Sequence, residues 1–327
     1  MVASEELKDL SDVHAKLLDV LGRVILGQRE AIDHAISALL CDGHVLLTGG
    51  AATAKGLLAL ALSRALKLDF KRVQFTPDLM PSDITGSEIL DEDPQSGHRV
   101  ARFVPGPIFT NILMADEINR TPPKTQAALL EGMQEKQVSA SGETRPLPRP
   151  FFVIATKTNI ETDGVYPLPE AQQDRFMLNV EMGVLSQDEE IEVILKDPAA
   201  NLDAVEPVLD GERLQAFQRV VRDIAVPPEV RQYIVNLTSA SRPGTPQAID
   251  AVNKYVAWGA GVRATQYLAL GAKALAALDS RDTAGENDVR SMALPVMRHR
   301  IGVNFLADND GVHPAEVVRL LLEQVRP

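Results

Sequence analysis

Short apolar runs that alternate with helical segments fill residues 1–198, and this alternation limits the possible folds more than any other feature of the chain. Each run is short and bounded by glycine or polar residues, which favours a buried strand over a helix. The runs lie at residues 44–47, 70–75, 112–115, 151–155 and 176–184. Strands that alternate with helices indicate parallel βαβ units and a sheet covered on both faces. We therefore predict an α/β fold.

Helical spacing of apolar residues marks the segments around these strands. The clearest segments are residues 11–21, 28–40, 55–68 and 122–136. Two polar stretches, at residues 87–103 and 137–149, interrupt the alternation. We interpret both as hairpins or loops inserted into the α/β scaffold, because neither has the apolar period of a core element.

The pattern changes after residue 198, where strand-like runs give way to an alanine- and leucine-rich remainder. Helical spacing is clearest there at residues 264–278 and 288–297. We predict two domains, an α/β core at residues 1–198 and an all-helical domain at residues 199–327.

The charge balance and the cysteine content exclude several classes of function. The chain has 33 Lys+Arg against 45 Asp+Glu, a net charge of −12, which disfavours broad binding to nucleic-acid phosphates. Cys41 is the single cysteine, so a disulfide framework and a multi-cysteine metal site are excluded. Acidic Glu5 and Glu6 stand where a signal peptide would be basic, and we see no apolar run of about 18 residues. We predict a cytoplasmic protein without a membrane span.

A turn rich in glycine and alanine follows the first predicted strand and opens a helix. It comprises Gly49, Gly50, Ala51, Ala52, Thr53, Ala54, Lys55 and Gly56. Small residues let backbone N–H groups surround phosphate oxygens, the helix N-terminus adds a positive dipole end, and a lysine adds a point charge. The spacing fits the phosphate-loop pattern G-x-x-x-x-G-K-[ST], although Ala54 and Gly56 depart from it. Taken alone, the turn fits either a phosphate loop or a plain strand-to-helix connection.

Two acidic residues, Asp116 and Glu117, end the predicted strand at residues 112–115. An aspartate at a strand tip is placed to hold Mg²⁺, directly or through water. A neighbouring glutamate is placed to orient and deprotonate an attacking water. An acidic pair downstream of a turn like this one strengthens the expectation of an ATP and Mg²⁺ site.

Several longer motifs carry a resemblance to a known family. They are QFTPDLMPSDITG at residues 74–86, PGPIF at 105–109, ADEINRTPPKTQ at 115–126, and YPLPEAQQDRF at 166–176. On these motifs the chain resembles the MoxR family of AAA+ ATPases over residues 20–305. The resemblance implies a P-loop core with a five-stranded parallel sheet flanked by helices, plus a C-terminal helical lid. It also implies ATP at the seam between neighbouring subunits of a ring, usually a hexamer.

The resemblance further implies roles for individual residues. Gly27 and Gln28 match the segment that approaches the adenine. Arg175 matches the arginine finger that reaches a neighbour's γ-phosphate, and Arg263 matches the sensor-2 arginine, which contacts the γ-phosphate of its own subunit. Thr158 stands where the family has an asparagine that positions the attacking water.

Departures from the family pattern lead to two hypotheses of activity. Gly56 lacks the hydroxyl of the usual threonine, Ala52 replaces a glycine, and Thr158 replaces the asparagine. The first hypothesis is an enzyme that couples ATP hydrolysis to chaperone-like remodelling of a partner protein, or to metal insertion into it. The resemblance suggests a partner with a von Willebrand factor A domain. The alternative is a scaffold ring that binds nucleotide with impaired hydrolysis.

Overall fold

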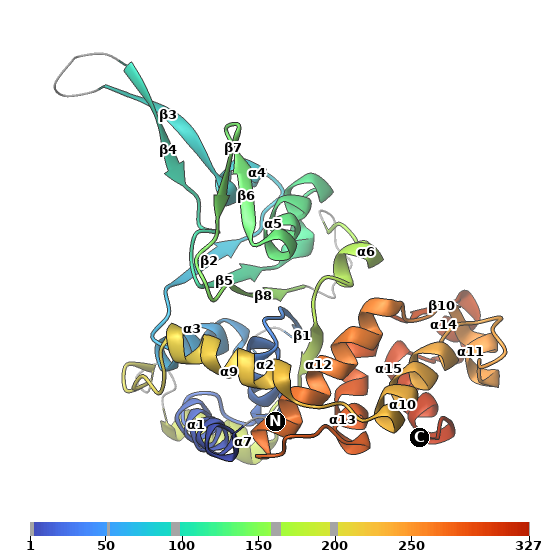
Figure 1. Cartoon of the computed structure of the whole chain (residues 1–327). Helices are drawn as coiled ribbons and strands as arrows, with labels where there is room; N and C mark the ends of the chain where they lie inside the picture. Colours follow the sequence, from blue (N-terminus) through green and yellow to red (C-terminus); the bar gives the residue numbers. More distant parts are fainter. Residues whose placement is uncertain (1–2, 51–52, 93–98, 158–164, 197–201, 327) are drawn as a thin grey trace.

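The computed structural model describes residues 3–50, 53–92, 99–157, 165–196 and 202–326. At the centre of these described residues lies a five-stranded sheet in which every neighbouring pair is parallel (Figure 1). The strands follow one another across the sheet as β2 (Phe70–Gln74), β5 (Ile112–Asp116), β8 (Phe152–Thr156), β1 (Val45–Gly49) and β9 (Leu178–Met182). Each predicted strand is present, which confirms the predicted α/β fold.

Helices bury both faces of the sheet. Successive side chains of a strand point to opposite faces, so each central strand contributes apolar side chains to both. Leu47 belongs to the apolar cluster on one face, and Leu46 belongs to the cluster on the other. The first face is covered by α1 (Ser4–Gly22), α2 (Arg29–Leu40) and α3 (Lys55–Ala65), and the second by α5 (Pro123–Glu135). This double burial explains why the central strands are apolar throughout rather than alternating with polar residues.

Strand β2 forms one edge of the sheet and brings polar side chains to the region where the strands end. Lys71, Arg72 and Gln74 on this strand are exposed. The parallel register pairs Arg72 with Met114 and Gln74 with Asp116. An edge strand tolerates such side chains because it has a neighbour on one side only.

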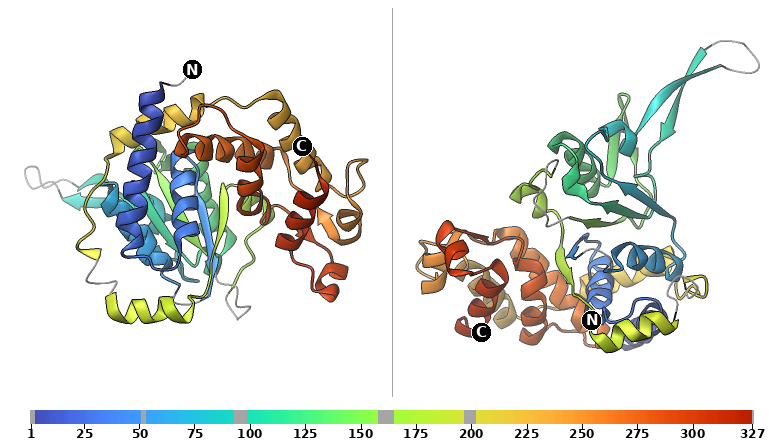
Figure 2. Two further views of the ribbon diagram at one scale, coloured as in Figure 1. Left: turned by 90° about the horizontal axis from the view of Figure 1, so that it is seen from below. Right: turned by 180° about the vertical axis from the view of Figure 1, so that it is seen from behind.

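Both predicted insertions are β-hairpins. The first joins β3 (Gly86–Glu92) to β4 (Arg99–Pro105) after the short helix α4 (Pro81–Thr85). The second joins β6 (Gln137–Ala140) to β7 (Glu143–Pro146). The β3–β4 hairpin projects away from the sheet, at the opposite end of the molecule from the C-terminal helices (Figures 1 and 2).

The C-terminal part is a group of helices, as predicted. They are α9 (Gly211–Asp223), α10 (Pro228–Ala240), α11 (Asp250–Tyr255), α12 (Val262–Leu278), α13 (Glu286–Met297), α14 (Phe305–Asp310) and α15 (Pro314–Gln324). In addition, β10 (Val256–Trp258) pairs antiparallel with β11 (Gly302–Val303), so this part is not helical throughout. Among the helices within the described ranges, none has both the length and the apolar character needed to cross a membrane.

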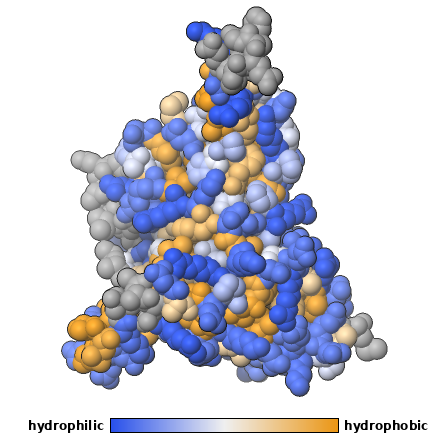
Figure 3. Space-filling model, turned by 90° about the vertical axis from the view of Figure 1, so that its left-hand side faces the viewer, coloured by the Kyte–Doolittle hydropathy of each residue, from blue (hydrophilic) through white to orange (hydrophobic). Residues whose placement is uncertain are grey.

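Shorter helices lie in the connections, and one of them is unusually exposed. They are η1 (Ile118–Arg120), α6 (Glu170–Gln173) and α7 (Gln187–Lys196). Helix α7 contributes no buried residue and exposes Ile191, Ile194 and Leu195. Figure 3 shows apolar areas among hydrophilic side chains on the face that lies to the left in Figure 1.

The core and the C-terminal helices share one apolar cluster. Helix α9 follows the predicted boundary at residue 198, yet the Gln218 side-chain amide on α9 donates to the Leu39 carbonyl oxygen of α2 at 2.8 Å. The boundary at residue 198 therefore stays a prediction from the sequence.

Arg300 follows the end of α13 and forms hydrogen bonds and an ion pair with the segment that leads into β9. Its side chain is 2% exposed and forms an ion pair with the Asp174 carboxylate at 2.7 Å. Its guanidinium also donates to the carbonyl oxygens of Asp174 (2.8 Å), Phe176 (2.6 Å) and Met177 (3.1 Å). One buried side chain thus serves several acceptors, which favours a structural role over a phosphate contact.

We expect the Arg300→Met substitution to lower the free energy of unfolding by about 3 kcal/mol, because it leaves a carboxylate and several carbonyl oxygens without their donor. Urea denaturation measures this change. The control is Arg319→Met, since Arg319 is 60% exposed and its ion pair with Glu316 contributes little. Equal effects of the two substitutions would contradict the anchoring role of Arg300.

Candidate functional site

The loop between β1 and α3 leaves the sheet at the carboxyl ends of the strands. Gly49 has a φ of 140°, and a Cβ atom there would lie 2.3 Å from the Met182 carbonyl oxygen on β9. Glycine is therefore required at the point where the loop begins. Ala54 is left-handed, with a φ of 58°, and directly precedes α3. Ala51 and Ala52, also predicted to line this loop, lie outside the described residues.

Lys55 is the first residue of α3, and its ammonium group folds back over the loop. It donates to the Gly50 carbonyl oxygen (2.7 Å), the Gly49 carbonyl oxygen (3.1 Å) and Thr53 Oγ1 (3.1 Å). Burial lowers the pKa of Lys55, while the negative charges of Asp116 and Glu117 raise it. The loop lysine and the acidic pair therefore act on one another, so the structure brings these predicted site residues together.

Asp116 ends β5, and its carboxylate is fixed by residues from both neighbouring strands. Thr156 Oγ1 on β8 donates to Oδ1 of Asp116 at 2.6 Å. Arg72 on β2 forms an ion pair with Oδ2, and the Asp116 side chain is 16% exposed. Carboxylate oxygens are ligands that Mg²⁺ prefers, so this position suits the predicted metal ligand.

Glu117 has a φ of 55°, an uncommon conformation for a residue other than glycine. Its backbone N–H donates to Thr156 Oγ1 at 2.8 Å. Its carboxylate accepts hydrogen bonds from Gln74 Nε2 at 2.9 Å and Arg120 Nη1 at 3.0 Å. The turn and these donors together determine where the Glu117 carboxylate lies.

Thr156 connects the two acids, since its hydroxyl donates to Asp116 and accepts from the Glu117 backbone. No local pattern in the sequence identified Thr156, Arg72 and Gln74 as site residues. The available signal for Thr156 was a polar residue at the end of an apolar strand. Which residues its hydroxyl contacts depends on the order of the strands in the sheet.

A cavity of about 380 Å³ is lined by Gly27 and Gln28 and by residues of β9. Gln28 is buried, and its side-chain amide donates to the Gly183 carbonyl oxygen at 2.9 Å. Gly183 follows Met182, which pairs with Gly49 across β9 and β1. Helix α13 closes the other side of the cavity. This position beside the loop suits the predicted contact with a nucleotide base.

Arg175 and Arg263 lie near the amino ends of the strands, whereas the loop lies at the carboxyl ends. Both line a cavity of about 170 Å³ together with His44, which directly precedes β1. Arg263 Nη1 forms an ion pair with Asp174 Oδ2 at 3.2 Å. The loop follows the other end of β1. The length of β1 therefore separates Arg263 from the loop. This position disagrees with the expectation that Arg263 contacts the γ-phosphate of its own subunit.

The remaining predicted site residues divide between described and undescribed parts of the chain. Gly56 lies in the first turn of α3, where a Cβ atom would meet nothing within 4 Å. Thr158, predicted to position the attacking water, lies outside the described residues.

Comparisons with known proteins place the chain in a family. The family model described as "ATPase family associated with various cellular activities (AAA)" matches residues 44–178. A second family model, described as "AAA lid domain", matches residues 249–320.

Individual relatives match over nearly the whole chain. The chaperone MoxR1 of Mycobacterium tuberculosis is 38% identical over 303 residues, covering 93% of this chain and 79% of the relative. The Bacillus subtilis protein YeaC is 36% identical, covering 98% of this chain and 96% of the relative. Protein MoxR of Paracoccus denitrificans is 31% identical, covering 90% of each. A crystal structure from Cytophaga hutchinsonii, provisionally named an ATPase, has a TM-score of 0.90 at 33% identity and covers 98% of this chain and 97% of its own.

Replacing Thr156 with valine keeps the side-chain shape but removes the hydroxyl. We expect the Thr156→Val variant to lose about 1–3 kcal/mol of unfolding free energy, because the Glu117 N–H and an Asp116 oxygen lose a partner. Chemical denaturation measures the loss, and Thr156→Ser, which keeps the hydroxyl, serves as the control. If the valine variant is as stable as the serine variant, Thr156 does not hold the acidic pair.

Proposed function

The chain belongs to the MoxR family of AAA+ ATPases, and on this premise we propose that it binds ATP with Mg²⁺ and hydrolyses it to ADP and phosphate. The convergence of Lys55, Asp116 and Glu117 at the carboxyl edge of the sheet carries this proposal. Ligands of α/β proteins bind outside the carboxyl ends of parallel strands, which is where these residues meet.

Each site residue within the described ranges has a role that its position supports. The loop and the N-terminus of α3 would hold the phosphates, with Lys55 exchanging loop oxygens for phosphate oxygens. Asp116 would hold the metal ion, directly or through water, and the bound ion neutralises charge on the phosphate oxygens. Glu117 would accept a proton from the attacking water. Gly27 and Gln28 would border the base, and Thr158 keeps its predicted role beside the water.

Hydrolysis is proposed to be slow, because Gly56 supplies no hydroxyl to the metal ion and Ala52 replaces a glycine. Water can fill the missing position, since Mg²⁺ commonly keeps several water ligands. The absent hydroxyl also favours a second candidate function, a scaffold ring that binds nucleotide and hardly hydrolyses it.

Phosphate release from the purified full chain separates these two functions. We expect slow turnover that falls about a hundredfold in Glu117→Gln, which removes the proton acceptor. We expect Gly56→Thr to raise turnover at least about threefold, because the space there accepts a side chain and its hydroxyl can bind the metal ion. Wild-type turnover equal to that of Glu117→Gln, with ATP still bound, would favour the scaffold.

We further propose that subunits form a ring, with six as the number that the family suggests. Arg175 and Arg263 lie at the edge opposite the loop, so in a head-to-tail arrangement both would face the neighbour's nucleotide. An arginine there stabilises charge in the transition state and contributes roughly 10³–10⁵ in rate. The exposed Ile194 of α7, 81% accessible, is further surface for such an assembly to cover.

Mixing two inactive variants tests whether Arg263 acts on the neighbour. An equimolar mixture of Arg263→Ala and Glu117→Gln is expected to recover turnover, because an intact Glu117 site then meets an intact Arg263 from the next subunit. A mixture of Lys55→Ala and Glu117→Gln should stay inactive, since both defects lie in the same site. Activity of the first mixture that equals the sum of its two parts would show that Arg263 acts within its own subunit.

The work done by hydrolysis is proposed to be chaperone-like remodelling of a partner protein or metal insertion into it. The name of the M. tuberculosis relative, a chaperone, supports this direction. A protein with a von Willebrand factor A domain remains the proposed partner, and the cytoplasm remains the proposed location. The net charge of −12 disfavours a function on nucleic acid.

A further inference from the structure

Asp174 contacts two arginines and directly precedes a third. Its Oδ1 lies 2.7 Å from Arg300 Nε, and its Oδ2 lies 3.2 Å from Arg263 Nη1. Arg175 follows it in the chain and lines the same cavity of about 170 Å³ as Arg263. Asp174 therefore connects the two arginines that are proposed to face a neighbouring subunit, and the proposed function gives Asp174 itself no role.

The carboxylate of Asp174 is itself held in one orientation. Arg300, which binds its Oδ1, is 2% exposed and also donates to the Asp174 backbone carbonyl oxygen at 2.8 Å. The Tyr267 ring lies over this guanidinium, with its centroid 5.0 Å from Arg300 Cζ. Tyr267 stands four residues after Arg263 on α12, so the two side chains share one face of that helix. Because Arg300 fixes Oδ1, Oδ2 is fixed toward Arg263.

Arg263 keeps most of its hydrogen-bonding capacity. A guanidinium has several N–H donors, and within the described ranges Asp174 is the only hydrogen-bond partner of the Arg263 side chain. That side chain is 35% exposed, so the ion pair contributes little to stability. The remaining donors are available for phosphate oxygens, which arginine binds through paired N–H groups.

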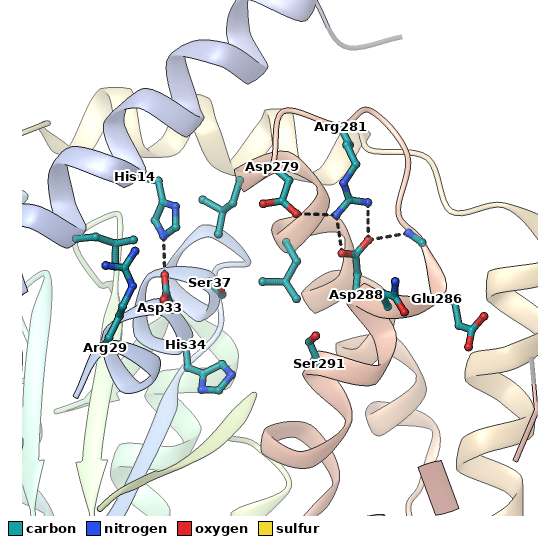
Figure 4. A pocket seen from close by; sticks show the side chains of 15 residues that line it. His14, Arg29, Asp33, His34, Ser37, Asp279, Arg281, Glu286, Asp288 and Ser291 are labelled. Carbon is teal, nitrogen blue, oxygen red and sulfur yellow. Dashed lines mark hydrogen bonds and ion pairs between the residues drawn. The ribbon is translucent and has the colours of Figure 1, made fainter. Parts of the chain in front are cut away.

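Figure 4 shows the opposite case, an arginine whose donors are taken by the fold. Arg281 binds both oxygens of Asp288, at 2.8 and 2.6 Å, and one oxygen of Asp279 at 3.0 Å. Such a bidentate pair commits the guanidinium to a structural contact. Asp174 instead engages Arg263 through a single oxygen, which orients the guanidinium and leaves it open to a second ligand.

The charges around Asp174 give its carboxylate a second effect. Burial lowers the pKa of Arg300, Asp174 opposes this, and the positive charge of Arg263 lowers the pKa further. The two guanidinium groups therefore repel one another, and the carboxylate between them offsets this repulsion. One carboxylate against the three guanidinium groups of Arg175, Arg263 and Arg300 still leaves an excess of positive charge, which suits a phosphate group.

We propose that Asp174 is a positioning residue, which holds the Arg263 guanidinium toward the neighbour's nucleotide and joins it to the segment that carries Arg175. This inference rests on the proposed function, in which Arg263 acts on the next subunit. Arg300 anchors the unit, because it binds both Asp174 and the backbone before β9. Holding the arginine in advance reduces the entropy that is lost when it meets the phosphate.

Phosphate release by mixtures of full-chain variants tests the proposal. We expect Asp174→Asn to lower turnover at saturating ATP at least about tenfold, because Arg263 loses its orientation. An equimolar mixture of Asp174→Asn and Glu117→Gln should exceed the sum of its parts, since an intact Glu117 then meets a correctly held Arg263 of the next subunit. A mixture of Asp174→Asn and Arg263→Ala should not, because both defects affect the same arginine.

Asp279→Asn is the matched control. Asp279 follows α12 at the end opposite Arg263, and it also gives one oxygen to an arginine. Because Asp288 still holds that arginine, turnover should stay within about twofold of the wild type. An equal loss of turnover in Asp279→Asn would show that any change of charge at an arginine pair disturbs the lid, and it would overturn the positioning role.

Two further measurements separate positioning from a structural role. The affinity of Asp174→Asn for a fluorescent ATP analogue should stay within about threefold of the wild type, because Lys55 and Asp116 are unchanged. Circular dichroism measures the folded fraction of the variant. If that fraction falls, Asp174→Glu takes its place in the mixtures. It keeps a carboxylate beside Arg300 but displaces the oxygen that faces Arg263, so the same pattern is expected.

The mixture of Arg263→Ala and Glu117→Gln distinguishes the two possible failures. If that mixture recovers turnover and the mixture of Asp174→Asn and Glu117→Gln does not, Asp174 has a structural role only and the proposal is overturned alone. If neither mixture recovers turnover, or if the wild type releases no phosphate, the proposed function fails and this inference fails with it.

Discussion

The parallel pairing of β1, β5 and β8 is the interaction on which the rest of the structure depends. The register aligns Leu47 with Thr156 across β1 and β8, and Ala115 with Ala155 across β5 and β8. The carboxyl ends of the three strands therefore meet at one edge, with the loop after Gly49 beside Asp116. A slip of one residue in a strand would turn its side chains to the opposite face, so burial of both faces protects the geometry of the site.

The acidic pair at this edge is stabilised more by buried hydrogen bonds than by its ion pairs. Arg72 and Arg120 are 57% and 46% exposed, and exposed ion pairs contribute about 0–1 kcal/mol each. Thr156 is 1% exposed, so loss of its hydroxyl would leave polar groups unsatisfied at a larger cost. The exposed arginines can therefore change partners around a ligand at little cost, while the threonine keeps the backbone of Glu117 in place.

Local patterns in the sequence predicted the strands, the hairpins and the loop, because short apolar runs and small residues depend on neighbours in the chain. The role of Thr156 was missed because it depends on which strand lies beside β5. Arg263 was expected at the loop of its own subunit, but its position depends on how the lid packs, which no local pattern encodes. The structural role of Arg300 likewise depends on tertiary contacts, since its guanidinium is buried against the carbonyl oxygens before β9.

Equilibrium titration with a fluorescent ATP analogue, with and without Mg²⁺, tests most directly whether a triphosphate and its metal ion occupy this edge. The account predicts that Lys55→Ala weakens binding under both conditions, because the lysine contacts the phosphates. It predicts that Asp116→Asn removes only the part of the affinity that depends on Mg²⁺. Failure of the wild-type chain to bind the analogue, or an unchanged affinity in both variants, would contradict it.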